Sequence, residues 1–191
     1  MKIKIKRQLV ILLFLSNIFF VGCLQNDMKS IVSDIDGEEY NKEISGEMSI
    51  RKATLLILEN RQEEVPTDFQ SIISDSLICV NNEWRAKYFK AFSIVISKFN
   101  EADKLKAEKD LFNYFLHYPN EYLHQIETIP LETSDLLLCM ISNQIKEYLL
   151  NENITLYSII NVSLKNCTEC NDQITNTIIE YINLAGRYLE E

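Results

Sequence analysis

Apolar residues recur three or four positions apart over nearly the whole stretch from residue 49 to residue 191. This spacing places them on one face of a helix, so it predicts a succession of amphipathic helices. The complete chain of 191 residues contains only 4 Gly and 3 Pro, which argues against a loop-rich or disordered polypeptide. We therefore expect an all-α fold with six or seven helices.

Local signals mark where these helices begin. Thr67-Asp68-Phe69-Gln70 has the pattern of a capping box, and Asn82 can cap the helix that follows. Pro119 disfavours helical geometry at the preceding residue but begins a helix well, and Ser134 can cap a later helix. The apolar stripes of the predicted helices extend over residues 69–80, 84–99, 105–116, 122–126, 137–149 and 174–189.

Residues 154–164 are ambiguous, because their apolar positions alternate as they do in a strand. A single strand would have no partner for its backbone hydrogen-bonding groups, so a helix is the better interpretation. The domain is therefore expected to be helical throughout.

The short connections between the predicted helices favour antiparallel αα-hairpins. Two similar helix starts, Asn82-Glu83-Trp84 and Asn120-Glu121-Tyr122, lie 38 positions apart, whereas pairing residues 110–126 with residues 143–159 gives a spacing of 33. A true helical repeat keeps one period, so the disagreement favours an irregular bundle over a short HEAT-like or TPR-like array. Both arrangements stay open on the sequence alone.

The first 22 residues differ from the rest of the chain. Residues 1–8 are basic, and residues 9–21 form an apolar run that is broken only by Ser16 and Asn17. The run is shorter than the roughly 20 apolar residues that a membrane-spanning helix needs. Its length and its charged flank are those of a secretory signal peptide, so residues 1–22 are predicted to be an export signal.

The end of this segment, Phe20-Val21-Gly22-Cys23, resembles the lipobox of bacterial lipoproteins, in which a small residue precedes an invariant cysteine. The resemblance covers only the first 23 residues, and Phe20 stands where the lipobox usually has leucine. It implies cleavage before Cys23, thioether lipidation of that cysteine and acylation of its new amino group. The acyl chains would hold the protein in the bacterial cell envelope, with its domain on the extracytoplasmic side, because each buried methylene contributes about 0.8 kcal/mol.

The charge of the chain is strongly acidic after this processing. The whole sequence has 19 basic and 28 acidic residues, and the signal removes four of the basic ones, which leaves a net charge of −13. Such a domain repels phosphate backbones, so nucleic-acid binding is not expected. Residues 23–48 are polar and acidic with little apolar periodicity and are predicted to be a flexible tether, and residues 49–191 are predicted to form a single domain.

Four cysteines follow the lipidated one: Cys79, Cys139, Cys167 and Cys170. An even number in an exported domain predicts disulfides, with three connectivities. Cys79 and Cys139 lie on apolar stripes near helix ends, so a bridge between them could link two hairpins, and reduced buried thiols are the alternative. Cys167-Thr-Glu-Cys170 has redox spacing but lacks a thioredoxin-like context, and its glutamate opposes thiolate formation. A zinc site would require all four cysteines to converge.

His117 and His124 are the only histidines, and with Glu121 they form the pattern H-x3-E-x2-H. On one continuous helix this pattern could bind a metal, but Pro119 is predicted to break the helix between the histidines. Solvated or hairpin-turn histidines are the better interpretation, and no metal site is predicted.

The sequence contains no Gly-x-Ser-x-Gly elbow, P-loop or dinucleotide-binding fingerprint, so we predict neither catalytic residues nor a cofactor. The expected function is that of a non-enzymatic, membrane-tethered lipoprotein that binds a protein partner or contributes to envelope structure. The alternative is an immunity-type lipoprotein that neutralises a toxin or hydrolase, since an acidic surface speeds association with basic enzymes.

Overall fold

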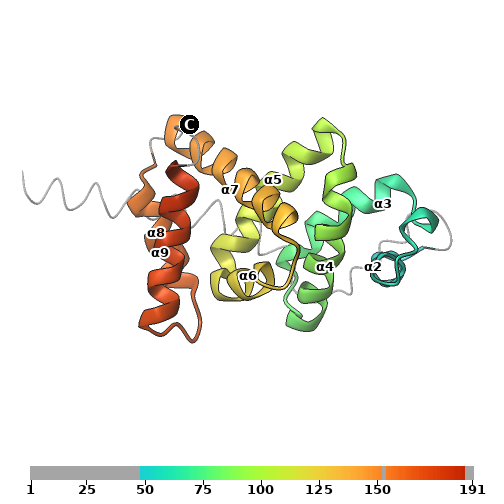
Figure 1. Ribbon diagram of the computed structural model, residues 1–191, viewed down its shortest axis with the longest axis horizontal. Coiled ribbons are helices and arrows are strands. Elements are labelled where there is room, and N and C mark those ends of the chain that lie inside the picture. The colour runs from blue at the N-terminus through green and yellow to red at the C-terminus, as the bar shows by residue number, and fades with distance from the viewer. Residues whose placement is uncertain (1–47, 152–153, 188–191) are drawn as a thin grey trace, which may run out of the picture. The chain divides into compact units, whose positions relative to one another are not determined.

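The computed structural model describes residues 48–151 and 154–187, which form α-helices and short 3-10 helices without a strand (Figure 1). The all-α prediction is confirmed. The described part has eight α-helices, whereas six or seven were predicted. The additional helix is formed by residues 50–58. The helices are α2 (Ile50–Leu58), α3 (Thr67–Ile72), α4 (Asn82–Val95), α5 (Glu101–His117), α6 (Pro119–Ile126), α7 (Leu131–Asn151), α8 (Leu156–Asn166) and α9 (Asp172–Arg187).

Three 3-10 helices extend or connect these elements: η2 (Gln62–Glu64), η3 (Ile73–Ile78) and η4 (Ile96–Lys98). The predicted signal, the lipidation site Cys23 and residues 23–47 of the predicted tether lie outside the described residues, while Met48 is described and packs against the core. Among the described residues, no helix has both the length and the apolar character needed to cross a bilayer.

Helix α5 is the centre of the packing. It contacts η3, α6, α7 and α8, while α9 packs against α6, α7 and α8. Its inner face is aromatic, and Phe115 is fully buried with its ring centroid 5.2 Å from that of Tyr122 and 5.5 Å from that of Tyr181. Contacts of this kind bury large apolar rings in favourable tilted or edge-on geometry, and they join α5, α6 and α9 into one core.

Helices α8 and α9 form an antiparallel hairpin, coloured brown-orange and red in Figure 1. The ambiguous segment is therefore helical, as predicted. Thr155 caps α8 by accepting a hydrogen bond from the Ser158 backbone nitrogen at 3.2 Å. The buried positions Ile159 and Ser163 are four residues apart, which is helical spacing.

The predicted capping box at Thr67 is wrong. The N-cap of α3 is Pro66, which makes no capping hydrogen bond with its side chain. The Gln70 amide turns away from Thr67 and donates to the backbone oxygens of Gln62 and Val65, at 3.3 and 3.1 Å. Gln62 belongs to the preceding turn η2 and Val65 follows it, and the hydrogen bonds to their carbonyl groups hold the amide whose oxygen a capping box would use as an acceptor.

The predicted start of α7 is also wrong. This helix begins at Leu131, directly after Pro130, and the Pro130 carbonyl oxygen accepts from the backbone nitrogens of Thr133 and Ser134. Ser134 therefore lies inside the first turn. By contrast, α5 ends at His117 and α6 begins at Pro119, so the predicted interruption of the helix is confirmed.

The cap of α4 lies one residue before the predicted one. Asn81, rather than Asn82, accepts a hydrogen bond from the Trp84 backbone nitrogen at 3.0 Å, and its backbone is extended as N-cap residues require. Asparagine is favoured at the N-cap, so the sequence allows either residue in that position. The path of the backbone after η3 places Asn81 there.

Replacing Asn81 with alanine is expected to lower the free energy of unfolding by about 1 kcal/mol, because one backbone donor at the start of α4 loses its acceptor. The same replacement at Asn82 is expected to change it by less than about 0.5 kcal/mol, since that side chain is exposed. Urea unfolding of the two variants measures both values. Equal losses at the two positions would contradict the assignment of the cap.

Candidate functional site

A polar cleft of about 700 Å³ opens where the start of α4, the α5–α6 junction and the α8–α9 turn meet. Its lining comes from three segments that are far apart in the sequence: Asn82 and Arg85 from α4, residues 117–121 and His124 from the α5–α6 region, and Asn166, Thr168 and Glu169 from the α8–α9 turn. The H-x3-E-x2-H pattern and the turn of the Cys167-Thr-Glu-Cys170 motif therefore meet at one site.

The floor of the cleft is an ion pair between Arg85 and Glu121. The Nη2 atom of Arg85 lies 2.5 Å from Oε2 of Glu121, and Nε lies 3.0 Å from both carboxylate oxygens. The side chains are only 6% and 22% exposed, respectively. Nη1 of Arg85 also donates to the backbone oxygen of Cys79 at 2.6 Å and to that of Val80 at 3.2 Å. The guanidinium group thus ties α6 to the end of η3 through charge-assisted hydrogen bonds.

Two tyrosines complete the surroundings of this pair. The Tyr114 hydroxyl donates to Oε1 of Glu121 at 2.9 Å, and the Tyr118 ring lies under the Arg85 guanidinium, whose carbon is 3.6 Å from the ring centroid. Burial by itself would lower the pKa of Arg85, but its hydrogen bonds and charge interaction with Glu121 outweigh this effect, and the pKa is raised. Burial also raises the pKa of Tyr114, and the Glu121 carboxylate raises it further. Arg85 is cationic and Tyr114 neutral at physiological pH.

The rim of the cleft has the opposite character. Five polar side chains of the lining make no hydrogen bond, ion pair or aromatic contact within the described part of the chain: Asn82, Asn120, His124, Thr168 and Glu169. They offer amide, imidazole, hydroxyl and carboxylate groups to a ligand. The floor therefore uses its polar groups within the protein, while the rim leaves its own available.

His117 stands between floor and rim. Its Nδ1 lies 2.9 Å from the backbone oxygen of Asn113, and because a carbonyl oxygen can only accept, Nδ1 is the donor. Nε2 is the ring nitrogen left for a ligand. His124 lies on α6, beyond the break at Pro119, and Glu121 is engaged by Arg85. Within residues 48–151 and 154–187, no three His, Cys, Asp or Glu side chains are grouped as metal ligands.

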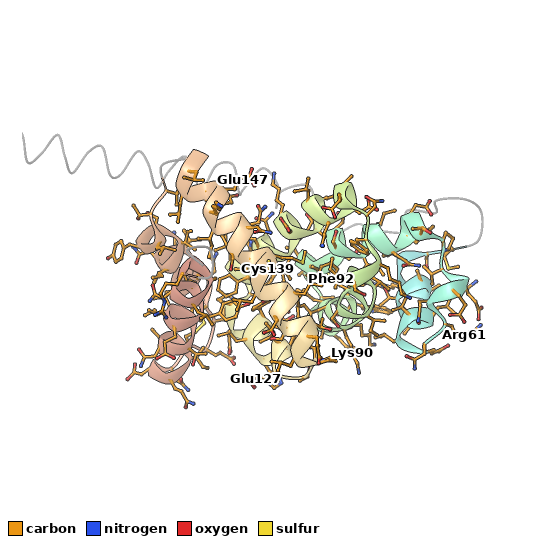
Figure 2. All side chains as sticks on the ribbon, turned by 45° about the horizontal axis from the view of Figure 1, so that its top comes forward. Arg61, Lys90, Phe92, Glu127, Cys139 and Glu147 are labelled. Carbon is orange, nitrogen blue, oxygen red and sulfur yellow. A yellow bond between two sulfur atoms is a disulfide. The ribbon has the colours of Figure 1, made fainter. Side chains whose placement is uncertain are left out.

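The four cysteines in the described part of the chain divide into two classes. Cys167 and Cys170 are joined by a disulfide that closes the α8–α9 turn. Cys79 and Cys139 are free thiols, so the suggested bridge between them is absent from the structure, and Figure 2 places Cys139 on α7. Burial raises the pKa of the Cys79 thiol, which keeps it protonated at neutral pH.

Arg85 is not among the predicted site residues, although the sequence contains a signal for it. Arg85 is three and four residues before the buried Tyr88 and Phe89, so it lies on the apolar face of α4. A charged residue on such a face requires a partner of opposite charge. The sequence could have indicated a buried ion pair, but it could not identify Glu121, which is 36 positions away. No protein-family model, no curated protein and no solved structure matches the chain.

Proposed function

We propose that this chain is a bacterial lipoprotein whose helical domain, held to the membrane by lipid on Cys23, binds a protein partner through the polar cleft. The observation that carries the proposal is the difference between the floor and the rim of the cleft. The polar groups of the floor are hydrogen-bonded within the chain, whereas those of the rim are available to a ligand. An ion pair with tight hydrogen bonds fixes the shape of the site before binding, and preorganisation lowers the cost of binding. The net charge of −13 after loss of the signal favours a basic partner.

Site-specific photo-cross-linking in cells tests the binding site. A photoreactive residue in place of Asn120, at the rim, is expected to give a covalent adduct with the partner. The same residue in place of Glu127, which is exposed at the end of α6 and labelled in Figure 2, serves as the matched control and is expected to give none. Adducts of equal yield at both positions, or none at position 120 at physiological salt, would contradict the proposal.

The lipid anchor is tested separately. The Cys23→Ser variant is expected to move from the membrane fraction to the soluble fraction, because the thioether and the acyl chains need the sulfur atom. Cys79→Ser is the control and is expected to stay membrane-bound. Intact mass of the membrane-extracted protein should show loss of residues 1–22 and addition of acyl chains. A Cys23→Ser variant that remains as firmly bound as the unaltered protein refutes the anchor.

A second candidate function is neutralisation of a toxin or hydrolase, and the strong acidity of the chain is the observation that favours it. Acidic surfaces resemble polyanionic substrates and accelerate association with basic enzymes. A toxin gene next to this one would support the idea. A deletion strain whose sensitivity to that toxin is unchanged would rule it out, while leaving the cleft proposal intact.

A further inference from the structure

The two residues by which the α8–α9 turn lines the polar cleft lie inside a disulfide ring. Thr168 and Glu169 both line the cleft, and they are the only residues between Cys167 and Cys170, whose sulfur atoms are joined. Both are exposed, so the ring presents its outer edge to the cleft and to solvent. This part of the cleft wall therefore has a covalent constraint that the floor does not have.

The backbone inside this ring is held in an unfavourable conformation. Glu169 has φ of 62°, in the left-handed region that glycine adopts readily and that a residue with a Cβ atom rarely adopts. Asn60 is the other described non-glycine residue with positive φ, but asparagine tolerates that region much better than glutamate does. A short covalent ring restricts the backbone, so it helps to hold Glu169 where it is.

The turn is connected to the histidine side of the cleft as well. The Asn166 amide, one residue before the ring, donates to the backbone oxygen of Leu116 at 2.9 Å, next to His117. On the other side of the ring, Asn171 caps α9 by accepting from the Ile174 backbone nitrogen at 2.9 Å. The ring therefore lies between a contact with the end of α5 and the start of α9.

We propose that the Cys167–Cys170 disulfide is a redox control of the polar cleft. A dithiol reductant attacks one sulfur of the pair through its thiolate and forms a mixed disulfide. Its second thiol then displaces the protein sulfur, so that the reductant leaves as a disulfide and Cys167 and Cys170 each gain a hydrogen. Opening of the ring allows Glu169 to relax to negative φ, and the wall formed by Thr168 and Glu169 moves away from the α5–α6 side. The biological role of this change rests on the proposed function of the cleft.

The chain contains suitable internal references for a test. Cys79 and Cys139 are already free, so a reductant acts on this disulfide alone among the described cysteines. Helix α2 (Ile50–Leu58) has no residue in the cleft and reports general loss of structure.

Amide hydrogen exchange of the mature chain, with and without dithiothreitol, measures the effect. Reduction is expected to accelerate exchange about tenfold at residues 167–171 and measurably at residues 117–124, with α2 unchanged. The double variant Cys167→Ser/Cys170→Ser should reproduce the reduced pattern without reductant. Glu169→Gly should diminish the response, because glycine keeps positive φ without a ring. Acceleration confined to the turn, acceleration throughout the domain including α2, or no change would each overturn the proposal.

Photo-cross-linking at position 120 separates this inference from the proposed function. Strong adducts from the oxidised protein and weak ones from the reduced protein support both. Equal adducts in the two states overturn the redox control and leave the binding function standing. No adduct in either state, combined with the expected exchange pattern, removes the partner-binding proposal and leaves the coupling between disulfide and cleft in place.

Discussion

Replacing Arg85 with methionine is expected to lower the free energy of unfolding by about 3–5 kcal/mol, which is the usual cost of removing one member of a buried ion pair. Methionine fills much of the same volume but donates no hydrogen bond. The Glu121 carboxylate would keep only the Tyr114 hydroxyl among its present partners, and the carbonyl oxygens of Cys79 and Val80 would lose their shared donor. Urea unfolding followed by far-ultraviolet circular dichroism measures the loss.

The same helix offers a matched control for this prediction. Lys87 pairs with Glu83 at 2.6 Å, but these side chains are 35% and 73% exposed. Exposed pairs contribute at most about 1 kcal/mol, so Lys87→Met should have a small effect. The double variant Arg85→Met/Glu121→Leu should recover part of the loss, because it removes both charges rather than leaving one alone. Equal effects of Arg85→Met and Lys87→Met would show that the cleft floor is not an energetic centre of the fold.

Stability is expected to fall steeply above about pH 10, where tyrosines of unfolded chains ionise. Burial raises the pKa of Tyr114, Tyr122 and Tyr181 above that value in the folded protein. Below about pH 10 both states keep these protons, so the stabilisation from the buried tyrosines is complete and does not change with pH. Above about pH 10 the unfolded chain loses the protons while the folded chain retains them, so rising pH favours unfolding. Each such tyrosine lowers the free energy of unfolding by about 1.4 kcal/mol per pH unit, and the three together by about 4 kcal/mol.

Denaturant unfolding at a series of pH values, together with phenolate absorbance, measures this slope. Tyr122→Phe should reduce the slope by about 1.4 kcal/mol per pH unit, since its buried hydroxyl, 2.6 Å from that of Tyr181, no longer ionises. Tyr157→Phe is the control, because Tyr157 is 71% exposed. In this variant the free energy of unfolding should fall with pH as steeply as in the unaltered protein. A stability that stays level through pH 11 would contradict the burial of the three hydroxyl groups.

Much of the fold could be predicted from the sequence because helix formation leaves a local signature. The apolar positions that recur at helical spacing are the ones buried in α4 and α5, such as Phe92 and Phe112, and Pro119 begins α6 for a reason contained in its own ring. The helix boundaries were harder. Asn81 and Asn82 are equally suited to a cap, and only the path of the chain out of η3 distinguishes them.

The candidate site could be predicted only in pieces. His117, Glu121, His124 and the Cys167–Cys170 pair were recognised as chemically capable residues, but nothing in their spacing showed that the α8–α9 turn would meet the α5–α6 junction. The sequence allows three ways of pairing the four cysteines in disulfides. The structure joins Cys167 and Cys170, which are nearest in the sequence, and leaves Cys79 and Cys139 free.

The helical class of the domain, the interruption at Pro119 and the acidity of the chain all follow from local sequence, because periodicity, proline geometry and net charge are properties of short segments or of composition. Packing between distant segments accounts for the pairing of Arg85 with Glu121 across 36 positions and for the meeting of three separate segments at one polar cleft. Contacts between distant segments depend on how all helices pack at once, and a buried charge must find its partner in that packing.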